Sequence, residues 1–234
     1  MWPPRSAPSG RLPIEPDAAK RLAAEAALEL VRPGMLLGLG TGSTARHFIA
    51  GLAGRDVTCI ASSVASSEQA RALGLRVVTE LDRKCDLAVD GADEIDPALG
   101  LIKGRGGALF REKLLAINSE RFVVIADESK LVNRLGVGVL PVEILPFLWR
   151  RSAQHFGERG IAWQLRGGEE APFVTDNGNL VLDLTLQGGI ENPLRLAGEI
   201  KLMPGVCEHG LFIGIAAGAI IAGENGIRRM GAFE

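Results

Sequence analysis

The sequence has few of the residues from which metal sites and thiol sites are built. It contains three cysteines and three histidines among 234 residues. They are Cys59, Cys85, Cys207, His47, His155 and His209. None of them forms a CxxC pair or a cysteine–histidine spacing typical of zinc ligands. We therefore expect no metal site, no catalytic cysteine and a reducing, cytoplasmic environment in which each thiol is a small core residue.

A strong charge bias and a membrane-length apolar run are also missing. The formal net charge is -2, which indicates neither a nucleic-acid partner nor a membrane partner, so any anion site must be local. The longest apolar runs, such as the one around 210–222, are interrupted by glycines and too short to span a bilayer. Residues 1–16 have no apolar central stretch, so we expect a flexible leader rather than a secretory signal.

Helical and strand-like patterns alternate from residue 17 onward. Helices are expected at 17–31, 43–52, 65–73 and from after Gly107 to about 117. Strands are expected at 35–40, 57–61, 76–79, 87–89 and 122–126. Strict alternation predicts an α/β fold, a Rossmann-like domain in which helices cover a parallel sheet.

The pattern changes after Pro141. Strands are expected at 142–145, 161–165, 173–175 and 180–184, and helices at 147–156 and 193–202. The sequence Asp-Asn-Gly-Asn at 176–179 is a strong hairpin-turn signal between the last two strands, and further strands begin at Leu211. These features predict a leader at 1–16, a Rossmann-like domain at 17–139 and about 212–234, and a small α+β, ferredoxin-like domain at 140–211.

A glycine-rich segment, GLGTGST at 38–44, separates an expected strand from an expected helix. Glycines let the backbone approach a ligand closely, and the first amides of the helix point toward it. Ser43 and Thr44 add hydroxyl donors, so the segment predicts a phosphate site that needs no metal. It lacks the lysine of a Walker loop and the third glycine of a dinucleotide fingerprint, which favours a small phosphate ester. The alternative is a tight turn with an ordinary Ser/Thr cap.

An acidic segment, DGADE at 90–94, follows another expected strand. Ligands bind at the carboxyl ends of strands in open α/β sheets, so Asp90 and Asp93 are expected to converge on one crevice. Acidic clusters also hold metals, and a solvated acidic turn is a further alternative.

A second glycine loop, KGRGG at 103–107, leads into a helix that carries Glu112. At about 100° per residue, Glu112 lies among Ala108, Leu109, Leu115 and Ala116. A carboxylate on an apolar stretch is desolvated, which raises its pKa and makes it a stronger base. The alternative is an ordinary solvated helix glutamate.

These segments, in this order and spacing, resemble ribose-5-phosphate isomerase type A. The resemblance also covers ADESK at 126–130, PVE at 141–143 and VTDNGN at 174–179, and it spans about 17–215. It implies an aldose–ketose isomerase that interconverts ribose 5-phosphate and ribulose 5-phosphate through an enediolate. It implies no cofactor, no metal and no nucleic-acid or membrane partner, and a homodimer or homotetramer.

The resemblance also implies a role for each site residue. The phosphate would be held by Thr41, Gly42, Ser43 and Thr44, helped by Lys20, with Lys130 nearby. Asp90, Asp93 and Lys103 would bind the sugar hydroxyls, assist ring opening and steady the enediolate. Lys103 and the amides of Gly104, Arg105, Gly106 and Gly107 are donors for its negative oxygen. Glu112 would move the proton between C1 and C2.

Two features depart from this family pattern, and two other classes share parts of it. Relatives tend to carry an acidic residue within 214–221, where this chain has Ala-Ala-Gly-Ala at 216–219, and the last residues match loosely.

A non-catalytic sugar-phosphate sensor would keep the phosphate loop but usually carries a DNA-binding helix pair, which a short leader cannot hold. Glucosamine-6-phosphate deaminases and phosphogluconolactonases share a similar glycine loop but not the segment from Lys103 to Glu112.

Overall fold

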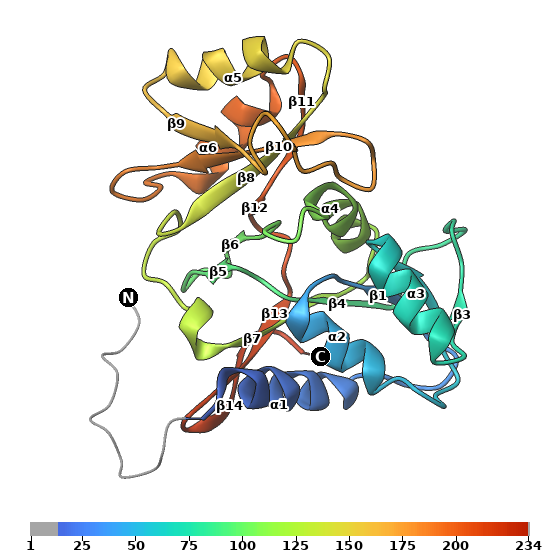
Figure 1. Cartoon of the computed structure of the whole chain (residues 1–234). Helices are drawn as coiled ribbons and strands as arrows, with labels where there is room; N and C mark the ends of the chain where they lie inside the picture. The colour runs from blue at the N-terminus through green and yellow to red at the C-terminus, as the bar shows by residue number, and fades with distance from the viewer. Residues whose placement is uncertain (1–13, 234) are drawn as a thin grey trace.

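The computed structural model describes residues 14–233 (Figure 1). The expected leader lies almost entirely outside this range, and its last residue, Pro16, begins helix α1 (Pro16–Leu28). Proline suits a first helical turn, where its missing N–H would have no intrahelical acceptor. The buried face of α1 consists of alanines, which allow the helix to pack closely against the central sheet.

A seven-stranded sheet forms the centre of the molecule. Its strands are β1 (Leu36–Leu39), β2 (Thr58–Ala61), β3 (Arg76–Val77), β4 (Leu87–Asp90), β7 (Phe122–Asp127), β13 (Gly218–Gly223) and β14 (Gly226–Gly231). They run in the order β14-β13-β7-β4-β1-β2-β3, all parallel except β14. In chain order the parallel strands read 3-2-1-4-5-6, the doubly wound order whose switch point lies between β1 and β4.

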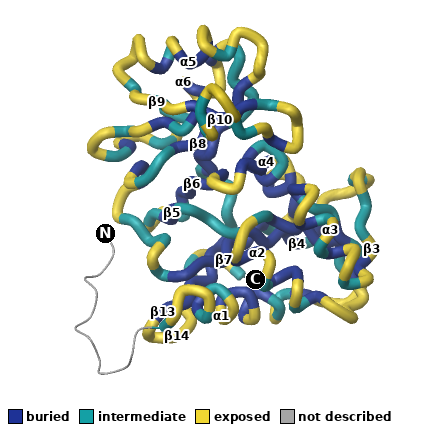
Figure 2. Tube along the Cα trace, in the orientation of Figure 1, coloured by how far each residue is buried: buried dark blue, intermediate teal, exposed yellow. Residues whose placement is uncertain are grey.

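Layers on both faces bury this sheet, and Figure 2 shows the buried residues concentrated along its central strands. On one face, alternate residues such as Leu37 and Val89 pack with α1 and α2 (Ser43–Ala50). On the other face, residues such as Ala88 and Val124 pack with α4 (Leu109–Ile117) and a small three-stranded sheet. Helix α3 (Val64–Ala72) lies beside β2 and β3. The strands are buried on both faces, as the sequence predicted.

The second part of the molecule is a smaller antiparallel sheet with two helices. Its elements are β8 (Val139–Ile144), α5 (Trp149–Gly157), β9 (Ala162–Leu165), β10 (Leu180–Thr185), α6 (Pro193–Lys201) and β11 (Val206–His209). The strand order is β11-β8-β10-β9, which is the 4-1-3-2 arrangement of a ferredoxin-like βαββαβ unit. The predicted fold class, a parallel α/β sheet with a smaller α+β unit, is confirmed.

Some predicted details are wrong. The strand expected at 173–175 is only a single bridge between Val174 and Leu180, and β10 pairs with β9 instead. The intervening turn does form, since the amide of Gly178 donates to Thr175 O at 2.9 Å. The chain before the turn diverges because Phe173 packs on Gly107 of the second glycine loop rather than in the sheet. Cys59 and Cys85 are buried as expected, but Cys207 on β11 is partly exposed.

Three short strands had no counterpart in the sequence prediction: β5 (Glu94–Ile95), β6 (Leu101–Ile102) and β11. A strand was expected to begin at Leu211, and β12 (Leu211–Phe212) begins there. β5, β6 and β12 form the three-stranded sheet in the order β12-β6-β5. A single 3-10 turn, η1 (Glu128–Lys130), follows β7. Within residues 14–233 there is no helix long and apolar enough for a bilayer crossing, and no group of three metal-ligating side chains arranged around one point.

Glu143 on β8 holds the turn at 175–179, which contacts Val64 and Arg111 of the larger part of the molecule. Its side chain is fully buried, and Oε1 accepts hydrogen bonds from Thr175 Oγ1 at 3.0 Å, Asn177 Nδ2 at 3.0 Å and Asn179 Nδ2 at 2.8 Å. Three donors therefore depend on one carboxylate oxygen.

Replacing Glu143 with alanine is expected to destabilise the fold by about 2–4 kcal/mol, because it leaves these donors without their acceptor. Urea unfolding followed by circular dichroism measures the effect. Glu169→Ala, on an exposed ion pair with Arg150, is the matched control and should change stability by under about 0.5 kcal/mol. Equal stability of the two variants would contradict this role.

Candidate functional site

The first glycine loop lies at the carboxyl end of β1 and leads into α2. The residue that caps α2 is Gly42, with φ of 106° and no side-chain hydrogen bond to the helix. The predicted alternative of an ordinary Ser/Thr cap is therefore wrong. Within residues 14–233, no acceptor bonds to the amides of Ser43 and Thr44. Unbonded amides at the positive end of a helix are suited to binding an anion.

Asp90 ties this loop to the neighbouring strand β4. Its Oδ1 accepts hydrogen bonds from the amides of Thr41 at 3.0 Å and Gly91 at 2.7 Å. The two segments lie so close that a Cβ atom on Gly40 would come 2.0 Å from Asp90 Cγ. Asp90 is buried, so the alternative of a solvated acidic turn is wrong for this residue. It joins the ends of the two strands on either side of the switch point.

A buried lysine links the acidic segment to α4. Lys103 Nζ lies 2.9 Å from Asp90 Oδ2 and 3.2 Å from Glu112 Oε2, and it donates to Gly91 O at 2.6 Å. The side chains of Lys103 and Glu112 are only 3% and 4% exposed. The prediction that Glu112 is desolvated is confirmed, and the alternative of a solvated helix glutamate is excluded.

This cluster contains two carboxylates and one ammonium group, and burial acts differently on each. Burial raises the pKa of Glu112 to about 8, the Asp90 carboxylate adds to that rise, and Lys103 opposes it. Burial also raises the pKa of Asp90, against the pull of Lys103. Burial alone would lower the pKa of Lys103, but Asp90 and Glu112 outweigh it and hold that pKa above its ordinary value. Lys103 therefore stays charged while Glu112 can exchange a proton near neutral pH.

The second glycine loop faces Asp93. The amide of Arg105 donates to Asp93 Oδ2 at 3.0 Å, and Arg105 Nε lies 3.8 Å from Asp93 Oδ1. Two positive φ angles, 105° at Gly104 and 82° at Gly107, give the loop its shape, and side chains would be strained at both positions.

These segments enclose a polar cavity of about 240 Å³ at the carboxyl ends of β1 and β4. Its lining is Lys20, Thr41, Gly42, Ser43, Thr44, Gly91, Ala92, Asp93, Lys103, Gly104, Arg105, Gly106, Glu112 and Lys130. All the predicted site residues line it except Asp90, which lies beneath Gly40, and Gly107, which faces Phe173. The cavity is also lined by Gly91 and Ala92, two residues of the acidic segment that were not among the predicted site residues.

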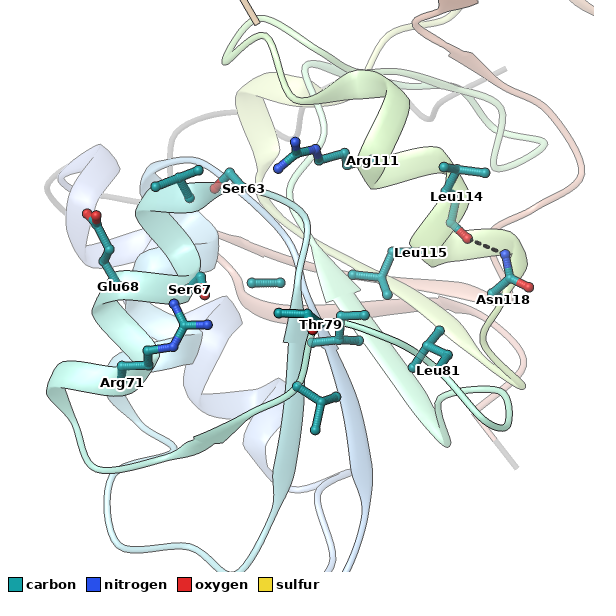
Figure 3. Close-up of a pocket in the computed structure, with 14 residues that line it drawn as sticks. Ser63, Ser67, Glu68, Arg71, Thr79, Leu81, Arg111, Leu114, Leu115 and Asn118 are labelled. Atoms are coloured by element: carbon teal, nitrogen blue, oxygen red, sulfur yellow. Dashed lines mark hydrogen bonds between the residues drawn. The ribbon is translucent and has the colours of Figure 1, made fainter. Parts of the chain in front are cut away.

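A second cavity of about 510 Å³ lies between α4 and α3 (Figure 3). Leu114 and Leu115 of α4 point into it, with Leu81 across from them. This larger cavity is mostly apolar and contains no buried charged group. The smaller cavity, with its anion loop and charged cluster, is the candidate active site.

The fold and the site together define a class: a doubly wound α/β protein whose switch-point cavity combines a glycine loop with free helix amides and a buried carboxylate of raised pKa. The sequence profile of ribose 5-phosphate isomerase A (phosphoriboisomerase A) matches residues 58–226. The chain belongs to this family.

Relatives and solved structures agree over most of the chain. Ribose-5-phosphate isomerase A of Rhodopseudomonas palustris (strain BisB5) is 50% identical over 92% of this chain and 98% of its own. A probable chloroplastic ribose-5-phosphate isomerase 3 of Arabidopsis thaliana is 44% identical over 93% and 84%. The structure of ribose 5-phosphate isomerase A from Neisseria gonorrhoeae, 36% identical, superposes with a TM-score of 0.89 over 94% and 99%. A D-ribose-5-phosphate isomerase in complex with phospho-erythronic acid, 33% identical, also gives 0.89 over 94% and 100%.

Proposed function

We propose that this protein interconverts D-ribose 5-phosphate and D-ribulose 5-phosphate through an enediolate. The observation that carries the proposal is the position of Glu112, a buried carboxylate that lines the same cavity as the anion-binding loop. Anchoring the phosphate at one end of this cavity fixes the distance of the sugar carbons from the base. Family membership supports the same reaction.

The isomerisation consists of two proton transfers, one between carbons and one between oxygens. Glu112 removes the proton from C2 of the open-chain aldose and returns it to C1, while the hydroxyl proton moves from O2 to O1. Lys103 places a fixed positive charge beside the base, where negative charge develops on the sugar oxygens. No electrons leave the substrate, so the reaction balances without an oxidant or a reductant.

The other residues divide into ligand contacts and supports. The phosphate is held by the amides and hydroxyls of Ser43 and Thr44, with charge from Lys20 and Lys130. Asp93 lines the cavity and serves the sugar hydroxyls and ring opening. Asp90 does not line it, so we assign Asp90 to holding Lys103 and the phosphate loop in place.

A coupled assay with ribose 5-phosphate tests the proposal. Ribulose 5-phosphate should form at a rate that saturates with substrate, and unphosphorylated ribose should react far more slowly at equal concentration. Glucosamine 6-phosphate and 6-phosphogluconolactone test the two related enzyme classes in parallel. Turnover of either of these, with none of ribose 5-phosphate, would overturn the assignment, and binding of ribose 5-phosphate without turnover would indicate a sensor.

Replacing Ser43 with alanine is expected to raise KM for ribose 5-phosphate by about 10-fold with little change in kcat. The hydrogen bond from Ser43 to the charged phosphate stabilises the bound substrate and the transition state equally, so its loss weakens binding without slowing the bound substrate. Ser67→Ala is the matched control, since Ser67 lines the other cavity. Initial rates over a range of substrate concentrations separate the two constants. A fall in kcat with unchanged KM would remove Ser43 from the phosphate site.

The proposed base also predicts the pH dependence. Glu112 acts in its ionised form and its pKa is raised to about 8, so kcat/KM should fall as the pH drops through about 8. Rates should be measured above about pH 6.5, because the second pKa of a phosphate ester is about 6. A kcat/KM that stays constant between about pH 6.5 and 8 would contradict a raised pKa at Glu112.

We further propose that the protein is a cytoplasmic homodimer or homotetramer, and that its chain divides into the domains expected from the sequence. Free cysteines support a reducing compartment. Exposed apolar side chains, Phe147, Leu148, Leu194 and Leu202, lie on or beside α5 and α6 and support a contact between subunits there. Separate hydrophobic clusters under the two sheets support the domain division. Light scattering after size-exclusion chromatography measures the subunit number.

A further inference from the structure

An arginine that follows a strand of the smaller sheet binds the backbone carbonyls of the second glycine loop. Arg166, the residue after β9, donates from Nη1 to both Gly104 O and Arg105 O, each at 3.0 Å. These carbonyls belong to the loop that lines the candidate active site, although Arg166 itself does not line the cavity. About 60 residues of chain separate Arg166 from the loop that it binds.

Arg166 is itself fixed on two sides. Its Nε donates to Asp183 Oδ2 at 2.9 Å and its Nη2 donates to Asp183 Oδ1, a two-pronged ion pair with β10. Its guanidinium lies 5.7 Å from the ring centroid of Phe173. Phe173 in turn packs on Gly107, where a Cβ atom would come 2.3 Å from the ring. The Arg166 guanidinium is thus held in one orientation. A guanidinium fixed by a bidentate ion pair cannot readily move with the loop, so the loop carbonyls must orient toward it.

The orientation of the carbonyls decides where the loop amides point. In a trans peptide, the C=O and the following N–H point in opposite directions. Because Arg166 binds the carbonyl of Gly104, the Arg105 amide points the other way, and it donates to Asp93 Oδ2 at 3.0 Å. The same geometry applies one residue further along. With the Arg105 carbonyl on Arg166, the amide of Gly106 points away from the smaller sheet.

Gly106 is exposed and lines the cavity, and no acceptor within residues 14–233 bonds to its amide. Among the neighbouring loop amides, Arg105 N–H binds Asp93 and Gly107 N–H donates to Gly104 O at 2.9 Å. The amide of Gly104 also has no bonded acceptor within residues 14–233, but Gly104 is buried. A positive charge on the carbonyl side also polarises the peptide and strengthens its N–H as a donor. Gly106 is therefore the exposed position at which the loop offers a free, oriented amide to a ligand.

We infer that Arg166, fixed by Asp183, is a positioning residue that directs the Gly106 amide at the oxygen of the sugar that becomes negative during isomerisation. This inference rests on the proposed function. Its physical basis is preorganisation: the donor is aimed before the charge develops, so it favours the transition state over the bound substrate.

The direct test is Arg166→Lys, which keeps the positive charge but cannot bridge two carbonyls and a carboxylate. We expect kcat for ribose 5-phosphate to fall by about 10- to 100-fold while KM stays within about twofold. Arg150→Lys is the matched control, because Arg150 lies in the same unit on an exposed ion pair and should leave both constants unchanged. Melting curves of both variants report whether the fold is intact.

Two binding measurements separate positioning from a general structural role. Phospho-erythronic acid carries a planar carboxylate where the enediolate carries its oxygens, and inorganic phosphate has no such group. In Arg166→Lys, the affinity for phospho-erythronic acid should fall by about 10-fold while that for inorganic phosphate stays unchanged. Arg166→Ala should regain part of its kcat when guanidinium is added at millimolar concentration, and ammonium at equal concentration should not restore it.

The outcomes are distinct. An inactive wild-type protein would defeat the proposed function itself. An active wild-type protein whose Arg166→Lys variant keeps its kcat would overturn the inference alone. Equal losses of affinity for both ligands would also overturn it, because they would indicate a general loosening of the site. If the Tm of Arg166→Lys lies well below that of the wild-type protein, Asp183→Asn provides the same test. It removes the negative charge that fixes the Arg166 guanidinium and leaves Arg166 itself unchanged.

Discussion

Replacing Glu112 with glutamine is expected to lower kcat for ribose 5-phosphate by about three orders of magnitude, with KM nearly unchanged. A positioned general base contributes about 10²–10⁴ to the rate, and an amide cannot accept the proton from carbon. The substitution keeps the shape of the side chain and removes one of two carboxylates beside Lys103. Because one ammonium then faces one carboxylate, the fold should not be weakened.

Exchange at carbon is the sharper measurement. In deuterated water, the wild-type protein should incorporate solvent deuterium into the sugar whenever the protonated base exchanges before returning its proton. Glu112→Gln should lose turnover and exchange together. Glu120→Gln is the matched control, since Glu120 is an exposed glutamate just after the same helix. A variant that loses turnover but keeps exchange would show that another group removes the proton.

The central sheet could be predicted from the sequence because its signals are local. Residues 36–39 have the sequence Leu-Leu-Gly-Leu, are followed by a glycine loop and a helical pattern, and form a strand buried on both faces. Each repeat of this pattern adds one parallel strand, and the handedness of the crossover leaves few alternative arrangements. The predicted boundaries are within three residues of the observed ones for most helices and strands of this sheet.

The three-stranded sheet could not be predicted in the same way, although a strand was expected to begin at Leu211, where β12 starts. β5, β6 and β12 have two residues each, too few to show a period of two. They form because Leu101 and Phe212 are buried against the central sheet, a contact that joins segments more than one hundred residues apart. The expected strand at 173–175 failed for a related reason, since long-range contacts of Phe173 outweigh its local preference.

The site shows the same division between local and long-range information. The phosphate loop, the acidic segment and Glu112 are each recognisable within a few residues of sequence. The burial of Asp90 under Gly40, and its absence from the cavity wall, depend on how closely β1 and β4 approach. Arg166 has no local signal at all, because its partners Gly104 and Asp183 are distant in the chain.

Lys103 is the residue whose loss should damage stability as well as activity. Replacing it with methionine, which has a similar length and no charge, leaves Asp90 and Glu112 buried together without a cation. Breaking a buried ion pair by removing one partner costs about 3–5 kcal/mol. We expect a loss of this size in urea unfolding at pH 8, together with loss of isomerase activity. Lys201→Met, on a more exposed pair with Glu208, should cost under about 1 kcal/mol.

The pH dependence of this loss distinguishes electrostatics from packing. The pKa values of Glu112 and Asp90 are raised in the folded protein, so the folded state gains protons that the unfolded state does not hold, and stability falls as pH rises through those values. Without Lys103 both pKa values should rise further. Lys103→Met should therefore be closest to the wild-type stability near pH 5 and furthest from it near pH 8. The double variant Lys103→Met/Glu112→Gln should recover part of the stability at pH 8 and none of the activity. A pH-independent deficit would mean that Lys103 acts through its packed side chain rather than through its charge.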